Sequence, residues 1–366
     1  MIVKTITCHD VYNVGAGLQA YALSEYLREL GNNVEIIDYK PDYLSNHFPL
    51  WGHVNPVFDK PIVRELYCFA KLPGRIKQYK SRRKKEFDSF KKDYLKCTQR
   101  YSSFDELKNN PPKADIIFAG SDQIWNTFFQ NGKDASFYLD FVPQGTIRAA
   151  YAGSFATDEL APEWKNQVKE WLSKMDYISV RESSGLNILN DIGITNATQV
   201  LDPVFLLDKS HWETICENLD LNEKYLLFYD FDNSEQAGKK AKKIAKEKGL
   251  KIYSLLQNPY ADRCFENYGP RAFVTLVKNA EFVFSNSFHA TAFSLIFEKQ
   301  FTVFNRNEKI NTRMRDIVTI MGIENHLITN DFNAKINNID YSIVSKIRDK
   351  NIKLSKAYLD KVLSGE

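Results

Sequence analysis

The chain has 366 residues, more than the roughly 250 to 300 residues at which a single hydrophobic core usually stops growing, so its length predicts two domains. Hydrophobic residues make up 43% and charged residues 26% of the chain, which excludes global disorder, and a formal net charge of +3 is too small to predict a nucleic-acid-binding protein. Five widely spaced cysteines without a CxxC pair predict neither a zinc site nor a disulfide framework, and they fit a cytoplasmic protein with reduced thiols.

The first forty residues predict a strand, a helix and a second strand, which together form a β-α-β unit of a parallel sheet. Residues 2–7 favour a strand, apolar residues recur at helical spacing from Leu18 to Leu30, and residues 34–39 form a short β-branched run. The glycine-containing loop 13–19 joins the first strand to the helix. Its glycines would let the backbone approach a ligand and the helix N-terminus would offer N–H groups to an anion, although a tight turn fits the spacing equally well.

Residues 41–110 interrupt this alternation and predict an insertion in the first domain. Residues 41–73 are irregular and loop-rich, whereas residues 75–96 predict a highly basic helix. Two interpretations of this basic helix stay open. It could lie against anionic lipid or phosphate, or it could be a solvated helix whose aromatic residues, such as Phe87 and Phe90, pack inward; the second is favoured.

Polar residues follow the next apolar strands at the point where each strand ends. Asp122 comes shortly after the strand 115–119, and Arg181 follows the strand 177–180. A carboxylate at a strand end suits a general base toward a sugar hydroxyl, but Asp122 could also cap a following helix, which the local sequence alone favours. Arg181 could bind a carboxylate or phosphate with its planar fork, pair with Glu182, or lie exposed. These strand ends predict an open α/β sheet that binds ligands outside the carboxyl ends of its strands.

A second round of strands and helices predicts a second domain over residues 204–330. The first domain then spans residues 1–203, the pair Asp202-Pro203 begins the linker, and a charged helical segment occupies residues 331–366.

A polar stretch in the second domain follows the apolar strand 282–284. It runs Ser285-Asn286-Ser287-Phe288-His289 and is followed directly by an apolar helix. His289 is the one histidine whose surroundings suggest chemistry, because an imidazole can both give and take protons near neutral pH. The spacing of the histidines and carboxylates predicts no metal site.

Six segments of the chain, in order and in approximate spacing, resemble the polysaccharide pyruvyl transferase family. They are Asn13 to Leu23, Gly120 to Asn126, Tyr151 to Phe155, Ser179 to Glu182, Asp202-Pro203 and Ser285 to Phe301. The resemblance covers about residues 1–330 and is weakest over residues 41–110.

The resemblance implies a fold of the glycosyltransferase B type, in which two Rossmann-like α/β domains face each other across a cleft. It also implies a transferase that moves pyruvate from phosphoenolpyruvate onto two hydroxyls of one sugar, forming a cyclic ketal on a surface polysaccharide or its lipid-linked precursor. The implied partners are phosphoenolpyruvate as co-substrate and a glycan or lipid-linked saccharide, with no cofactor and no nucleic acid. Such a protein would work in the cytoplasm and could associate peripherally with the inner face of the membrane.

The resemblance also assigns roles to residues. The family's histidine maps onto His289 as the acid/base catalyst, and Asp122 is expected to assist the acceptor hydroxyl. The expected donor-binding residues are Arg181, Ser285, Ser287, Asn311 and Arg313. The expected acceptor or anion loop comprises Asn13, Gly15, Gly17, Gln19, Ser121, Gln123, Trp125 and Asn126.

One position departs from the family pattern. The family often has an arginine two residues before the histidine, where this chain has Ser287. Phosphoenolpyruvate carries a carboxylate and a phosphate, so its pocket needs arginines or helix N-termini. Arg313 or Arg315 could supply the missing guanidinium, and Arg271 is a weaker candidate.

Two other functions stay open beside the pyruvyl transferase. One is a glycosyltransferase on the same fold that uses a nucleotide-sugar donor. The other is a non-catalytic polysaccharide-assembly protein that has kept the fold and lost the chemistry at Ser287.

Overall fold

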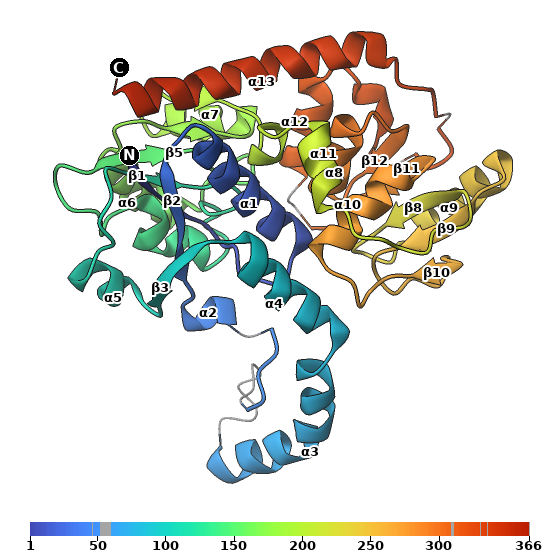
Figure 1. Cartoon of the computed structure of the whole chain (residues 1–366), viewed down its shortest axis with the longest axis horizontal. Coiled ribbons are helices and arrows are strands. Elements are labelled where there is room, and N and C mark those ends of the chain that lie inside the picture. Colours follow the sequence, from blue (N-terminus) through green and yellow to red (C-terminus); the bar gives the residue numbers. More distant parts are fainter. Residues whose placement is uncertain (46, 52–59, 309–310, 330, 335, 366) are drawn as a thin grey trace.

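A computed structural model describes the chain from residue 1 to residue 366, except residues 46, 52–59, 309–310, 330, 335 and 366. Two parallel β-sheets lie side by side, each flanked by helices, and a long C-terminal helix passes over both halves (Figure 1). The protein therefore has the α/β class, with parallel sheets, that the strand pattern predicts.

The N-terminal sheet has the strand order β3-β2-β1-β4-β5, and all of its strand pairs are parallel. Its strands are β1 (Ile2–Ile6), β2 (Asn33–Tyr39), β3 (Cys97–Tyr101), β4 (Ile116–Ala119) and β5 (Ile147–Ala150). The central strands β1 and β4 are almost entirely buried, as the near-continuous apolar sequence of a covered parallel strand requires. A short parallel pair, β6 (Ser179–Val180) and β7 (Thr198–Gln199), continues beside β5.

The C-terminal sheet has the order β10-β9-β8-β11-β12-β13, again with parallel pairs throughout. Its strands are β8 (Tyr225–Tyr229), β9 (Lys251–Ser254), β10 (Arg263–Cys264), β11 (Phe282–Ser285), β12 (Phe301–Phe304) and β13 (Leu327–Ile328). The strands β8, β11 and β12 are buried along their whole length and form the centre of this half.

Helices begin and end where the sequence supplies caps. The side chain of Asn13 caps α1 (Val14–Glu29), and the side chain of Ser234 caps α9 (Glu235–Lys248), which ends at Gly249 with a φ of 65°. A proline in the first turn begins α10 (Pro270–Asn279).

The other described α-helices outside residues 60–95 are α2 (Asp42–Ser45), α5 (Phe104–Asn109), α6 (Lys165–Leu172), α7 (Ser183–Asp191), α8 (Lys209–Ile215), α11 (Phe288–Ile296), α12 (Thr312–Ile320) and α13 (Tyr341–Ser364). Short 3-10 turns are η2 (Asn131–Lys133), η3 (Ala135–Tyr138), η4 (Pro162–Trp164), η5 (Pro203–Phe205) and η6 (Glu324–His326).

Each sheet has a topological switch point, where the chain changes the side on which it adds strands. The switch point lies between β1 and β4 in the N-terminal sheet and between β8 and β11 in the C-terminal sheet. Open α/β sheets bind ligands in the crevice at the carboxyl ends of such strands. The topology therefore marks one position for a ligand on each half of the molecule.

Helix α13 ties the two halves together along the top of Figure 1. Near its start, the hydroxyl of Tyr341 donates to the carbonyl of Ser294 at 3.3 Å in the C-terminal half. Near its end, the hydroxyl of Tyr358 donates to the carbonyl of Ala150 at 2.8 Å in the N-terminal half. The C-terminal segment thus fixes the halves relative to each other.

The region between β2 and β3 differs from its predicted form. Most of it is helical: α3 (Pro61–Tyr79) begins well before the basic helix predicted at residues 75–96. That predicted helix is in fact two, because α3 ends and α4 (Arg82–Tyr94) begins after Ser81, whose side chain caps α4. The prediction failed because Pro73, which usually breaks a helix, lies inside α3.

Two further points concern this region. The edge strand β3 belongs to the N-terminal sheet, although the sequence predicted only an insertion there. The parts of the predicted loop that fall on residues 46 and 52–59 lie outside the described residues.

Candidate active site

A small cavity lies between the two topological switch points. Its walls come from the segments that follow β1, β4, β8 and β11, so both sheets contribute, and from two arginines of the C-terminal half. The cavity encloses about 80 Å³, room for several water molecules or one small polar ligand. Because both sheets direct strand ends toward it, this cavity is the candidate active site.

His289 lines the cavity from the first turn of α11 and is 6% exposed. Its imidazole packs against the backbone of Gly15 in α1, so closely that a Cβ on Gly15 would lie 2.0 Å from Nδ1. Nε2 lies 3.9 Å from Oδ2 of Asp202, beyond hydrogen-bond range, and has no hydrogen-bond partner within the described part of the chain. Burial lowers the pKa of His289 below its ordinary value of 6.5, so the ring is neutral at pH 7.

Asp122 lines the cavity opposite His289, from the N-terminal half. Its Oδ1 lies 3.6 Å from Nη2 of Arg181 and 3.4 Å from Nη1 of Arg313. Burial alone would raise the pKa of Asp122, but the two guanidinium groups outweigh it and hold the pKa below its ordinary value. The interpretation of Asp122 as a helix cap is wrong, because residues 123–130 form turns and bends instead of a helix.

Arg181 is buried at the end of β6 and contacts carboxylates instead of lining the cavity. Its Nε donates to Glu182 at 2.7 Å and its Nη1 to Asp202 at 2.6 Å, while the guanidinium lies 4.5 Å from the ring centre of Phe288. Burial would lower the pKa of Arg181, but Glu182 and Asp202 raise it above its ordinary value. Arg181 therefore acts as a permanent cation that holds the acidic groups around the cavity.

Two other arginines line the cavity with unused hydrogen-bonding capacity. Arg313, from α12, is 8% exposed; burial, reinforced by Arg181, lowers its pKa to about 10. Arg306 follows β12 and pairs with Glu308 at 2.9 Å. Among the described residues neither Nε has a hydrogen-bond partner. Both Nε atoms are buried, although the Arg306 side chain is 18% exposed and its Nε lies 3.9 Å from Oδ1 of Asp232. A buried guanidinium nitrogen without a hydrogen bond favours the arrival of an anionic ligand, which would complete it.

Sequence reasoning missed Arg306. It carries the same signal that identified Asp122 and Arg181, a polar residue shortly after a buried strand, because β12 ends at Phe304. Its guanidinium also lies 4.8 Å from the ring centre of Phe231, at the switch point of the C-terminal sheet.

The serines before His289 build the turn that enters α11. The hydroxyl of Ser285 donates to the carbonyl of Tyr229 at 2.6 Å and accepts from the N–H of Ser287 at 3.0 Å. The Ser287 hydroxyl accepts from the N–H of Ala290 at 3.3 Å and so caps α11. Ser287 lines the cavity but brings no charge, whereas Ser285 does not line it.

Three residues of the expected acceptor or anion loop line the cavity: Asn13, Gly15 and Gln123. The side chain of Asn13 accepts from the N–H groups of Gly15 at 2.9 Å and Ala16 at 3.3 Å. These helix N–H groups are thus engaged by the protein's own cap, while the side-chain oxygen of Gln123 is buried with no hydrogen-bond partner in the described chain.

The other five expected residues support the cavity from behind. Gly17 faces an aromatic ring of α4, at 3.4 Å from where its Cβ would be. Gln19 accepts from the N–H of Ser121 at 3.0 Å, and the Ser121 hydroxyl donates to a carbonyl at 2.7 Å. Trp125 donates to a backbone carbonyl at 3.0 Å, and Asn126 accepts from a backbone N–H at 3.1 Å. None of these five lines the cavity.

The contacts of the remaining candidates for anion binding show which of them can reach a ligand in the cavity. Asn311 accepts from the N–H of Arg306 at 2.8 Å and donates to its carbonyl at 2.9 Å, so it positions the Arg306 loop. Arg315 lies on the surface and pairs with Asp158. Arg271 donates to a backbone carbonyl at 2.9 Å and is absent from the cavity wall. Arg313 is therefore the better candidate of the three arginines.

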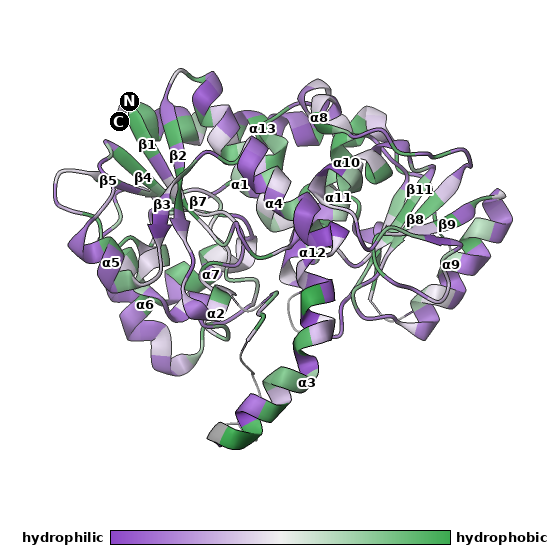
Figure 2. Ribbon diagram, turned by 60° about the horizontal axis from the view of Figure 1, so that its bottom comes forward, coloured by the Kyte–Doolittle hydropathy of each residue, from purple (hydrophilic) through white to green (hydrophobic). Residues whose placement is uncertain are grey.

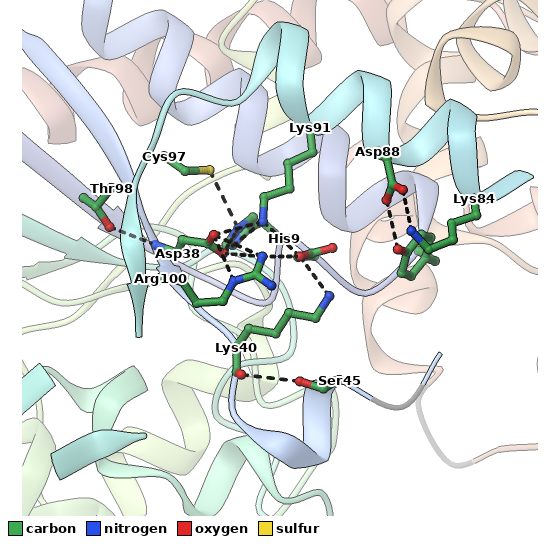
Figure 3. A network of polar contacts seen from close by, with 12 residues as sticks. His9, Asp38, Lys40, Ser45, Lys84, Asp88, Lys91, Cys97, Thr98 and Arg100 are labelled. Carbon is green, nitrogen blue, oxygen red and sulfur yellow. Dashed lines mark hydrogen bonds and ion pairs between the residues drawn. The ribbon is translucent and has the colours of Figure 1, made fainter. Parts of the chain in front are cut away.

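A larger pocket of about 580 Å³ opens near the ends of β1, β2 and β3, and Figure 3 shows its charged network. Asp10 pairs with Lys40 and Lys91, both at 2.9 Å, and Asp38 pairs with Lys91 at 3.0 Å and Arg100 at 3.1 Å. Burial alone would raise the pKa of Asp10, but its lysine partners lower it to about 2. These charges satisfy one another, so the smaller cavity with unpaired groups is the better site for chemistry.

No group of three or more His, Cys, Asp or Glu side chains in the described part of the chain is arranged to hold a metal ion. None of the helices described here is both long enough and apolar enough to cross a membrane.

The two parallel sheets, with switch points that face one cavity, define a protein of the glycosyltransferase B type of fold. The chain is similar to the S. aureus MnaA–UDP structure, with a TM-score of 0.50 and 12% identity over 96% of this chain and 87% of that chain. It is also similar to the Neisseria meningitidis UDP-GlcNAc 2-epimerase bound to UDP-GlcNAc (TM-score 0.48, 11% identity, 98% and 93% covered). The E. coli heptosyltransferase WaaC with ADP-2-deoxy-2-fluoro heptose is more distant (TM-score 0.40, 11% identity, 96% and 100% covered). At these identities the similarity concerns the fold alone.

The family model for polysaccharide pyruvyl transferase matches residues 13–308. The chain therefore belongs to the polysaccharide pyruvyl transferase family, a family of transferases. This match confirms the resemblance seen in the six sequence segments. No curated protein matches the chain in sequence.

Proposed function

We propose that the protein transfers pyruvate from phosphoenolpyruvate onto two hydroxyls of a sugar, in a surface polysaccharide or its lipid-linked precursor, and forms a cyclic ketal. The observation that carries this proposal is the set of buried, unpartnered nitrogens around one small cavity: Nε of Arg306, Nε of Arg313 and Nε2 of His289. Two cations and a proton carrier suit a small substrate that has two anionic groups and must be protonated.

The donor's charges match the two arginines. Arg306 and Arg313 reach the cavity from different elements and can hold the carboxylate and the phosphate of phosphoenolpyruvate. They replace the arginine that the family often has at the position of Ser287. Arg181 supports this arrangement indirectly, because its ion pairs with Glu182 and Asp202 offset part of the negative charge that would otherwise repel an anion.

His289 is the proposed proton donor. Burial lowers its pKa, and an anion bound beside it would favour the protonated ring. The imidazolium then gives a proton to the methylene carbon of phosphoenolpyruvate, whose double-bond electrons form the new C–H bond. The adjacent carbon becomes an oxocarbenium-like centre, which a sugar hydroxyl can attack.

Asp122 is the proposed base for the acceptor. As the first hydroxyl oxygen bonds to the cationic carbon, its proton passes to Asp122 or to neutral His289. The bond from that carbon to the phosphate oxygen then breaks, and both electrons leave with phosphate. The second hydroxyl adds to the same carbon and its proton passes to the released phosphate, which closes the ketal. Atoms and charges balance without a redox step.

The experiment is a titration of the protein with phosphoenolpyruvate in a calorimeter, followed by incubation with phosphoenolpyruvate and a panel of hexose and N-acetylhexosamine acceptors. We expect saturable binding and release of inorganic phosphate with at least one acceptor. Arg313→Ala should weaken binding, whereas Arg315→Ala, the matched control on the same helix, should not. A protein that ignores phosphoenolpyruvate but is stabilised by a nucleotide diphosphate would point to a nucleotide-sugar donor instead.

A further inference from the structure

Helix α3 projects from the body of the protein (Figure 1), and apolar side chains on it are exposed. Ile62, Leu66 and Phe69 follow one another at spacings of four and three residues and are 77%, 67% and 67% exposed. Ile76 continues the stripe at 38% exposure, and Figure 2 shows apolar and polar residues alternating along the helix. This spacing places the apolar residues on one face of the helix.

A stripe of this kind requires a partner. Single exposed apolar residues are normal on a protein surface, but a contiguous apolar patch marks an interaction surface. The ring of Trp51, itself 40% exposed, lies 5.6 Å from the ring of Phe69 and extends the patch. An aromatic ring beside aliphatic side chains is typical of helices that lie in a membrane interface.

The charge of this region identifies the partner. Six of the twenty-one residues from 60 to 80 are Lys or Arg and one is acidic, in a chain whose formal net charge is only +3. A second copy of the chain docked on the same stripe would bring two strongly cationic segments together. An anionic lipid surface offers both an apolar layer for the stripe and counter-charges for the lysines and arginines.

The neighbouring helix α4 does not share this property. Its aromatic residues Phe87 and Phe90 are buried, and Lys84 pairs with Asp88 along the helix. Lys91 is engaged by the carboxylates shown in Figure 3. The sequence left two interpretations open for one basic helix over residues 75–96. The inward-packed interpretation fits α4, whereas the interpretation as a membrane-binding helix fits α3.

We propose that α3 is a docking helix that binds the interface of an anionic lipid bilayer through Ile62, Leu66 and Phe69. The proposal stands on the structure of α3 and does not require the pyruvyl transfer. If the protein also transfers pyruvate, docking bears on where the acceptor binds. Tyr79, at the end of α3, lines the larger pocket, whose charged network Figure 3 shows. Docking would hold this pocket near the bilayer, where the polar head of a lipid-linked acceptor is found.

Sedimentation with vesicles tests the proposal directly on the full chain. Vesicles of phosphatidylcholine with a third of phosphatidylglycerol should bind the protein at low salt, and vesicles of phosphatidylcholine alone should bind it far less, because the basic residues need anionic lipid. The double variant Leu66→Ser/Phe69→Ser should lower the partition coefficient on the order of 100-fold, since both side chains lose their apolar burial. The matched control Ile343→Ser/Leu354→Ser removes two similarly exposed residues, at 57% and 55%, from α13 and should bind like the wild type.

A further double variant separates the contribution of charge from that of apolar insertion. Lys71→Glu/Lys77→Glu keeps the stripe and should weaken binding to anionic vesicles at low salt, with less effect at high salt where charges are screened.

The proposal is overturned if the wild type does not bind anionic vesicles at low salt, or if the control variant on α13 loses as much binding as the stripe variant. It is also overturned if Leu66→Ser/Phe69→Ser dissolves a dimer seen by sedimentation velocity while vesicles bind neither form, because the partner is then a second copy. Phosphate release with a water-soluble acceptor is measured separately, so failure of the docking helix and failure of the pyruvyl transfer give different results.

Discussion

The imidazole of His289, in the C-terminal half, rests on the backbone of Gly15, in the N-terminal half, with no room for a side chain between them. A Cβ at position 15 would lie 2.0 Å from Nδ1 of the ring. Glycine at this position therefore serves the packing of the proposed catalytic histidine against the other half of the molecule.

Gly15→Ala should displace His289 and cost turnover on the order of 100-fold, because a shift of about 1 Å at a reacting group has that effect. Gly17→Ala is the matched control on the same helix: its Cβ would lie 3.4 Å from the ring of Phe90, and alanine favours a helix over glycine by up to about 1 kcal/mol. We expect this control to keep activity and melting temperature. Equal activity of both variants, measured as phosphate release, would contradict the placement of His289.

Binding of phosphoenolpyruvate should be accompanied by uptake of a proton. Burial lowers the pKa of His289 in the free protein, and the anionic donor should raise it, so the complex binds more protons than the free protein. Donor affinity should therefore fall as pH rises, by at most about tenfold per pH unit for one proton. Calorimetry in buffers of different ionisation enthalpy counts the protons.

The control for this proton is His289→Gln, compared at a pH above ~7, where the phosphate of the donor is largely ionised. The variant should bind the donor without proton uptake and should lose turnover by roughly 100-fold to 10,000-fold as a general acid–base catalyst is removed. Proton uptake that persists in His289→Gln would assign the titrating group elsewhere.

Arg313→Ala should weaken binding of the donor without lowering the stability of the folded protein. Burial and the nearby Arg181 lower the pKa of Arg313 from 12.5 to about 10, which means that its surroundings in the protein disfavour its charge. Removing it should raise the dissociation constant of phosphoenolpyruvate by roughly 10-fold to 100-fold, the range of a lost charge-assisted hydrogen bond. The melting temperature without ligand should stay the same or rise. A large drop in melting temperature together with unchanged donor affinity would show that Arg313 is structural.

Asp122→Asn should separate donor binding from turnover. The amide keeps the shape of the side chain but removes a negative charge close to Arg181 and Arg313, so affinity for the anionic donor should stay equal or increase. Loss of the proposed base should lower turnover on the order of 100-fold. Kinetics with saturating acceptor measure both values, and weaker donor binding with normal turnover is the result that opposes this role.

The sequence predicted much of the fold because burial and periodicity are local properties. The strands predicted at residues 115–119 and 282–284 match β4 and β11 to within one residue at each end, since apolar runs form buried strands. Helix α3 was missed over residues 61–74, because Pro73 and exposed aromatic residues do not follow the usual pattern of a helix packed on a core.

The candidate site was predictable only in part. His289 and Asp122 were identified as polar residues after buried strands, and both line the cavity. Which way a strand-end side chain points depends on the rest of the fold: Arg181 turns to Asp202 and Glu182, and Arg306, which was missed, turns to the cavity. The contact between Gly15 and His289 joins residues from the two halves, so no local pattern could indicate it.

The most direct test of the proposed function is product analysis after incubation with phosphoenolpyruvate and a panel of sugar acceptors. The account predicts inorganic phosphate and a sugar that has gained one cyclic pyruvyl ketal, in equal amounts, and neither product with His289→Gln. Absence of both products with every acceptor, together with no binding of phosphoenolpyruvate to the wild-type protein, would contradict it.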